Sequence, residues 1–204
     1  MANPLYDNLI GEHATNDACF LRQPGKPAVS FRQFSERTSQ VANLLLKHGL
    51  KPGDRVAVQA SKTIEMVILY GATIQAGGIF LSLNTDYKKD EISYFIKDAS
   101  PKIFVCDPQK RKDLEDIANQ VGSQVLTLDK DGQGSLQSQA NILSKTFNTI
   151  DRGPDDLVAL LYTSGTTGRS KGAMLTQNNL LSNAKTLKNL WEVNEDDILI
   201  HALP

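Results

Sequence analysis

The residue types best suited to chemistry are concentrated in residues 161–172, which read Leu-Tyr-Thr-Ser-Gly-Thr-Thr-Gly-Arg-Ser-Lys-Gly. This segment holds three glycines, five serine or threonine residues and two cations, and it has no carboxylate. Glycine lets backbone N–H groups approach an anion closely. Hydroxyl groups donate further hydrogen bonds or bind a hard cation such as Mg²⁺, and Lys171 supplies a mobile positive charge. Because a polyphosphate needs these groups together, the segment predicts a phosphate-binding loop.

The same residues leave other interpretations open. A surface turn rich in Gly, Ser and Thr is common, although such a turn needs neither so many hydroxyl groups nor the absence of acids. A P-loop NTPase or kinase is disfavoured, because Gly172 follows Lys171 where a Walker A loop requires Ser or Thr. Hydrolase chemistry is also disfavoured, because Ser164 is not in a GxSxG sequence. A non-catalytic nucleotide-binding module would carry the same loop, and it stays an alternative.

The elements on either side of this segment must position it. The apolar run at residues 157–162 predicts a buried strand directly before the loop, and residues 173–175 predict a return strand after it. Thr176 is the expected N-cap of a helix over residues 177–191, whose apolar residues recur at helical spacing. The loop is therefore expected between two strands, without a helix dipole directed at its ligand.

The rest of the chain alternates short β-rich runs with helical periods. Strands are expected at residues 55–59, 79–83, 102–106 and 124–128 and just before His201, and helices at about 31–48, 63–76, 86–98 and 109–121. Such alternation is typical of parallel βαβ units, so we expect an α/β fold of layered βαβ units with a mostly parallel sheet. The polar region at residues 130–154 is the expected sub-boundary.

Composition limits the kind of partner. Lys and Arg total 22 and Asp and Glu 23, a net charge of −1, without the basic excess that nucleic-acid or membrane-surface proteins usually carry. Cys19 and Cys106 stand far apart, so neither a zinc site nor a disulfide framework is expected. The N-terminal residues lack the basic and apolar regions of a signal peptide, and no stretch predicts a membrane span. We therefore expect a cytoplasmic protein that binds neither nucleic acid nor membrane.

The remaining candidates have ordinary structural interpretations. His48 is expected to cap the C-terminus of the helix at 31–48, where a partial positive charge is favourable. A structural role is also expected for His201. The pair Asp196 and Asp197 could ligate a metal, although an acidic turn is the commoner arrangement.

Residues 162–172 resemble the phosphate-binding signature of the adenylate-forming enzymes, which include acyl-CoA synthetases, peptide-synthetase adenylation domains and firefly-type luciferases. Residues 29–57 and 75–84 resemble two earlier segments of the same family in the same order, with Ser82 in place of the family's usual proline. The resemblance covers nearly the whole chain. A narrower similarity, to the bacterial malonyl-CoA synthetases, is carried by residues 105–108, 149–153, 163–174 and 196–204.

The resemblance implies an ATP-dependent acid–thiol ligase. In that reaction a short carboxylate, malonate on the narrower resemblance, attacks the α-phosphate of MgATP to give an acyl-adenylate and pyrophosphate, and the thiol of coenzyme A then displaces AMP. Carried over by position, the residues that would hold the β- and γ-phosphates are Ser164, Gly165, Thr166, Thr167 and Gly168. Lys171 would neutralise the departing pyrophosphate, and Thr163 is the candidate Mg²⁺-side hydroxyl.

The resemblance also implies that catalytic residues lie outside this chain. The family's catalytic lysine belongs to a small C-terminal lid domain, and the determinants of the acyl substrate come after Pro204. Residues 1–204 are therefore expected to be the N-terminal portion of the large AMP-binding domain, a truncated piece that is inactive alone. The whole protein would serve fatty acid metabolism. A general acyl-CoA synthetase and a peptide-synthetase adenylation domain stay alternatives.

Overall fold

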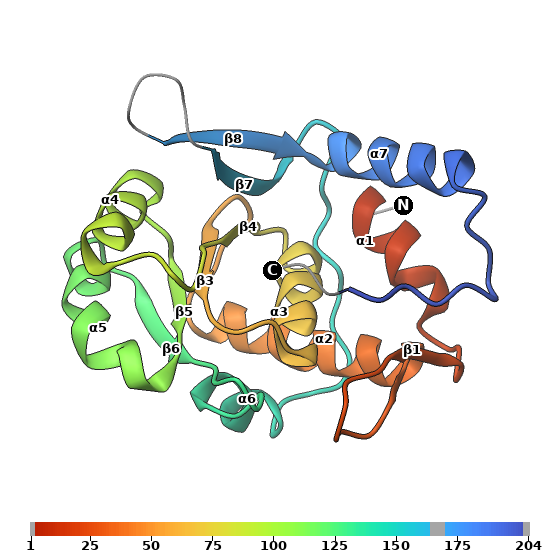
Figure 1. Ribbon diagram of the computed structural model, residues 1–204, viewed down its shortest axis with the longest axis horizontal. Helices are drawn as coiled ribbons and strands as arrows, with labels where there is room; N and C mark the ends of the chain where they lie inside the picture. Colours follow the sequence, from red (N-terminus) through yellow and green to blue (C-terminus); the bar gives the residue numbers. More distant parts are fainter. Residues whose placement is uncertain (1–2, 164–169, 202–204) are drawn as a thin grey trace.

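The architecture is built on one mixed sheet. A computed structural model describes residues 3–163 and 170–201 (Figure 1). The strands of the sheet follow the order β6-β5-β3-β4-β7-β8; the first five run parallel, and β8 is antiparallel to β7. The bounds of these strands are β3 Arg55–Gln59, β4 Ile79–Ser82, β5 Ile103–Cys106, β6 Gln124–Thr127, β7 Leu157–Thr163 and β8 Lys171–Thr176. The expected α/β fold with a mostly parallel sheet is confirmed.

The helices lie between the strands, as the alternating pattern predicts. The four longer helices before β7 are α2 Phe31–Lys47, α3 Ile64–Gln75, α4 Lys89–Ala99 and α5 Arg111–Gln120. The other elements are α1 Pro4–Leu9, η1 Gly11–His13, β1 Cys19–Leu21, β2 Val29–Ser30, η2 Pro108–Lys110, α6 Ser135–Ala140 and α7 Gln177–Leu190. Among the residues that the structure describes, no helix is long and apolar enough to span a membrane.

Side chains of alternate strand residues enter two separate cores, one on each face of the sheet. In β3, Val56 and Val58 pack in the core that α2 and α3 cover, whereas Ala57 packs in the core of α4 and α5. The same alternation in β5 sends Val105 to the first core and Cys106 to the second. Figure 1 shows α4 and α5 on one side of the strands and α2 and α3 on the other. The sheet is therefore the middle of three layers.

Local signals explain where the principal helices begin and end. Ser30 caps α2, because its hydroxyl accepts from the Gln33 amide at 3.2 Å while the Gln33 side chain accepts from the Ser30 amide at 3.0 Å. His48 is the C-cap residue of α2, as expected, and its Nε2 lies 3.1 Å from Gln139 Oε1.

Helix α3 is buried on several sides, between α2 and the sheet, which accounts for its nearly continuous apolar sequence.

The expected strand before His201 is wrong. Residues 198–200 pair with no strand in the described part of the chain, and Ile198, Leu199 and Ile200 are each more than 80% exposed. A β-rich run becomes a strand only where its N–H and C=O groups meet the edge of a partner strand. The segment instead has no regular secondary structure, and the His201 side chain contacts Lys62, with 3.0 Å between Nδ1 and Nζ.

Candidate functional site

The polar segment is carried by the hairpin of β7 and β8. Thr163, the last residue of β7, is the register partner of Lys171, the first residue of β8, and Tyr162 faces Gly172. The prediction that the loop connects two strands is therefore confirmed. Five of the predicted phosphate ligands lie outside the described residues: Ser164, Gly165, Thr166, Thr167 and Gly168. Their roles stay predictions.

The two predicted site residues that the structure describes face one another across the end of the hairpin. Facing Cα atoms of an antiparallel pair are about 4.5–5.5 Å apart. Thr163 and Lys171 therefore start from the same place on one face of the hairpin, and both residues are exposed. No ion pair of Lys171 occurs within residues 3–163 and 170–201. Its positive charge is thus available to an anionic ligand.

Gly172 allows the hairpin to close tightly beside Lys171. A Cβ atom at this position would lie 3.0 Å from Leu160 Cδ1 and 3.5 Å from Tyr162 Cε1. Any larger residue would therefore press on side chains of the facing strand. This close approach explains why glycine follows the lysine. A Walker A loop has Ser or Thr at that position, so the two kinds of loop differ here.

Tyr162 ties β7 to helix α4. Its hydroxyl group donates a hydrogen bond to the carboxylate of Asp98, and its ring lies 4.5 Å from that of Phe95 between centroids. Burial, together with the Asp98 carboxylate, raises the pKa of Tyr162 well above its ordinary value. The phenol therefore remains a hydrogen-bond donor at neutral pH, directly before Thr163.

Helix α4 also contacts the other side of the hairpin. The hydroxyl of Tyr94 donates to the backbone carbonyl of Ser170 at 2.9 Å, and Ser170 directly precedes Lys171. Sequence reasoning did not find Tyr94 or Asp98 as site residues. Their spacing of four on one helix face was the available signal, because such residues are neighbours on the helix surface. That signal alone does not tell which element the face meets.

The predicted Mg²⁺ ligand is consistent with the residues around it. No cluster of three or more His, Cys, Asp or Glu side chains that could hold a metal exists in the described residues. Mg²⁺ usually keeps several waters and takes few protein ligands when it is bound to substrate phosphates, so a single exposed hydroxyl at Thr163 fits that chemistry.

Asp197 accepts a hydrogen bond from the backbone amide of Asn194 at 2.8 Å, and this bond supports an acidic turn at Asp196 and Asp197 over a pair of metal ligands.

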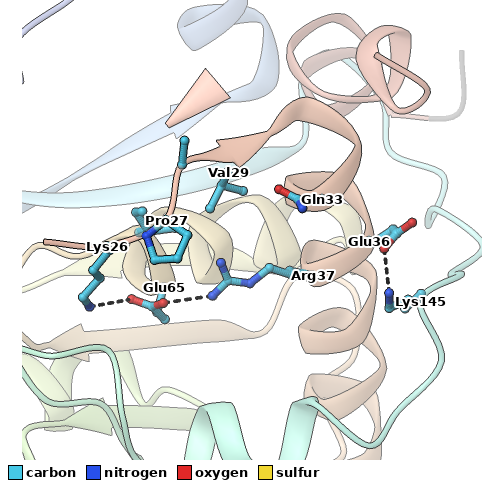
Figure 2. A pocket seen from close by; sticks show the side chains of 10 residues that line it. Lys26, Pro27, Val29, Gln33, Glu36, Arg37, Glu65 and Lys145 are labelled. Carbon is cyan, nitrogen blue, oxygen red and sulfur yellow. Dashed lines mark hydrogen bonds and ion pairs between the residues drawn. The ribbon is translucent and has the colours of Figure 1, made fainter. Parts of the chain in front are cut away.

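A hollow of about 370 Å³ lies on α2 and α3 beside the β1–β2 hairpin, away from the β7–β8 hairpin (Figure 2). Its three cations lie beside two carboxylates: Arg37 binds Glu65 at 2.9 Å, Lys26 lies 4.0 Å from the same carboxylate, and Lys145 binds Glu36 at 2.9 Å. The Glu65 side chain is only 10% exposed. The Arg37–Glu65 pair joins α2 to α3, and the two carboxylates balance two of the three positive charges in the hollow.

Comparison with known proteins places the chain in an enzyme family. Residues 12–204 match the family described as AMP-binding enzyme. Apo MatB from Rhodopseudomonas palustris superposes with a TM-score of 0.95 at 49% identity, over 99% of this chain and 40% of that chain. The ATP-bound structure of the same protein gives the same values.

Curated relatives include ligases and synthases. Tyrocidine synthase 2 of Brevibacillus parabrevis is 37% identical over 147 residues, which are 72% of this chain and 4% of that protein. Oxalate–CoA ligase of Arabidopsis thaliana is 30% identical over 168 residues, 80% of this chain and 32% of that protein. The chain thus spans well under half the length of these relatives. It belongs to the AMP-binding enzyme family and has the fold of the N-terminal domain of adenylate-forming enzymes.

Proposed function

We propose that this chain supplies the ATP-phosphate-binding part of an acyl-CoA synthetase, an acid–thiol ligase. The observation that carries the proposal is the end of the β7–β8 hairpin, where Lys171 has no ion-pair partner among the described residues and faces Thr163. The 49% identity to a protein whose structure was solved with ATP supports the nucleotide. Residues 1–204 would form the N-terminal portion of the large domain, with residues 130–154 as a sub-boundary.

The residues of this chain would act by position and charge. Lys171 would balance the negative charge that grows on pyrophosphate as the carboxylate attacks the α-phosphate. The Thr163 hydroxyl would bind on the side of Mg²⁺, and Ser164 to Gly168 would donate hydrogen bonds to the β- and γ-phosphates. Fixing the triphosphate in this way lowers the entropy cost of bringing it to the carboxylate. Coenzyme A would receive the acyl group in the second step.

The substrate we propose is a short carboxylate, malonate in particular. The similarity of residues 163–174 and 196–204 to bacterial malonyl-CoA synthetases supports it. A relative named for another small dicarboxylic acid, oxalate, is 30% identical. The reaction would take place in the cytoplasm and would provide acyl-CoA for fatty acid metabolism.

Two other functions remain as alternatives. The 37% identity to Tyrocidine synthase 2 favours an adenylation domain of a peptide synthetase, which would activate an amino acid instead. The chain alone could also act as a nucleotide-binding module without catalysis. Substrate choice separates the first alternative from our proposal, and turnover separates the second.

The test is acid-dependent release of pyrophosphate by the full-length protein. Malonate, oxalate, acetate and a set of amino acids are supplied one at a time with MgATP, and acyl-CoA is measured after coenzyme A is added. Our proposal expects release with malonate and thioester formation. Release with an amino acid alone would favour the peptide-synthetase alternative, and orthophosphate release without any acid would refute adenylate chemistry.

Replacement of Lys171 tests its assigned role. Lys171→Ala is expected to slow adenylation about 10²-fold, the usual effect of removing one charge-stabilising donor from an active site. Lys185→Ala is the matched control, since Lys185 is an exposed lysine on α7 and is outside the hairpin. Equal adenylation rates for the two variants would refute the role of Lys171.

A further inference from the structure

We propose that helix α4 positions both strands of the phosphate-binding hairpin through Tyr94 and Asp98. The inference rests on the proposed function and deepens it, because it assigns positioning residues to the MgATP site. Asp98 holds the strand that enters the loop, and Tyr94 holds the strand that leaves it. Neither side chain needs to touch the nucleotide.

The two contacts reach residues directly next to the predicted ligands. The Tyr94 hydroxyl donates to the Ser170 carbonyl at 2.9 Å, one residue before Lys171. The Asp98 carboxylate accepts from the Tyr162 hydroxyl, one residue before Thr163. Because residues four apart lie on one face of a helix, a single face of α4 contacts both sides of the hairpin. Tyr162 is the register partner of Gly172, so Ser170 lies two residues nearer the loop than that pair.

Aromatic packing makes this connection stiff. The Phe95 ring lies 4.5 Å from the Tyr162 ring and 5.4 Å from the Tyr94 ring, measured between centroids. Tyr162 packs against the buried core on the α4 side of the sheet, which includes Ile92. The hairpin end is therefore connected to a rigid layer and not only to its own backbone hydrogen bonds.

Strand β8 needs such support because it lies at the edge of the sheet. Its only partner in the described sheet is β7, and residues 171–174 are exposed. Strand ends with few buried contacts open more easily than the centre of a sheet. Without the bond from Tyr94, the ammonium group of Lys171 would occupy a wider range of positions, and MgATP would have to select the productive one.

The experiment combines two readouts in the full-length protein. Amide hydrogen exchange of residues 171–173 measures opening of the β8 end, and steady-state kinetics of pyrophosphate release separates KM for MgATP from kcat. The variants are Tyr94→Phe, Asp98→Ala and Asp98→Asn. The control is Tyr87→Phe, since the Tyr87 ring lies 5.0 Å from Phe95 but its hydroxyl makes no hydrogen bond in the described residues.

Tyr94→Phe is expected to speed exchange at residues 171–173 about fivefold and to raise KM for MgATP by a similar factor, with a smaller change in kcat. This factor corresponds to about 1 kcal/mol, the net contribution of one hydrogen bond. Asp98→Ala is expected to raise KM likewise. Asp98→Asn keeps an acceptor for Tyr162, so its KM for MgATP is expected to lie closer to that of the wild type. Tyr87→Phe should match the wild type in both exchange and KM.

The proposal is overturned if Tyr94→Phe and Tyr87→Phe show the same exchange at residues 171–173. It is also overturned if exchange rises without any change in KM, because the hairpin would then not need to be positioned. Absence of acid-dependent pyrophosphate release by the wild type would instead refute the proposed function. In that case hydrogen exchange alone still decides whether α4 holds the hairpin.

Discussion

The buried thiol of Cys106 should make the stability of this protein fall at alkaline pH. Cys106 lies on β5, between β6 and β3 in the sheet, and is fully buried in the core formed with α4 and α5. Burial raises the pKa of this thiol from its ordinary value of 9.0 to about 11. Nearby charges act in both directions: Arg111 lowers the pKa, whereas Asp107 raises it.

The sign and the size of the effect follow from this shift. The folded protein holds the thiol proton more tightly than the unfolded chain, so the stabilisation is complete below pH 9 and is lost as the pH rises toward 11. One pKa unit corresponds to about 1.4 kcal/mol. The free energy of unfolding should therefore fall by about 1.4 kcal/mol between pH 8 and pH 10 through Cys106, and by about 2.7 kcal/mol at still higher pH.

The assay is urea denaturation at pH 8 and pH 10 under reducing conditions, with Cys106→Ala compared to the wild type. The alanine variant loses some packing at both pH values, but that cost does not depend on pH. Tyr6, Tyr70 and Tyr162, whose pKa values are also raised, remain in both proteins and cancel. Cys19→Ala, which removes an exposed thiol, is the control. Equal losses of stability in Cys106→Ala and the wild type would refute the argument.

Two further substitutions probe the frame that carries the site. Glu65→Ala leaves Arg37 and Lys26 without their shared carboxylate, which is only 10% exposed. The free energy of unfolding, measured by urea denaturation, should therefore fall by about 2 kcal/mol. A loss under about 0.5 kcal/mol would show that water already screens the ion pairs of Glu65. Gly77→Ala forces a φ of +72° on alanine and brings its Cβ to 3.0 Å from Ile150. The free energy of unfolding should therefore fall by about 1–2 kcal/mol in the same urea denaturation. An unchanged denaturation midpoint would contradict the expected backbone strain.

The hairpin around the loop could be predicted because its signals are local. An apolar run of β-rich residues precedes the loop, another follows it, and Thr176 caps the next helix by accepting from the Asn179 amide at 3.2 Å. The strands expected at 55–59, 79–83, 102–106 and 124–128 also form to within one residue at each end. In these cases the residues of one segment carry both its periodicity and its boundaries.

The strand expected before His201 failed for the opposite reason. Ile198, Leu199 and Ile200 have high β propensity, but a strand is completed by the edge of another strand, and propensity says nothing about whether that edge is present. The same limit applies to the ion pairs of Glu65. Arg37 and Lys26 come from segments far along the chain, and nothing in their spacing identifies Glu65 as their common partner.

The part of the site that sequence reasoning missed depends on strand order. Helix α4 follows β4, and β4 lies beside β7 in the sheet, with Phe80 facing Ala159. This pairing across a long stretch of chain is what brings Tyr94 and Asp98 to the hairpin. A phosphate-binding motif is therefore visible in twelve consecutive residues, whereas the groups that fix its position are visible only once β4 and β7 are known to be neighbours. If α4 is what holds Lys171 in place, substitutions on this helix should change MgATP affinity although the helix contributes no predicted ligand.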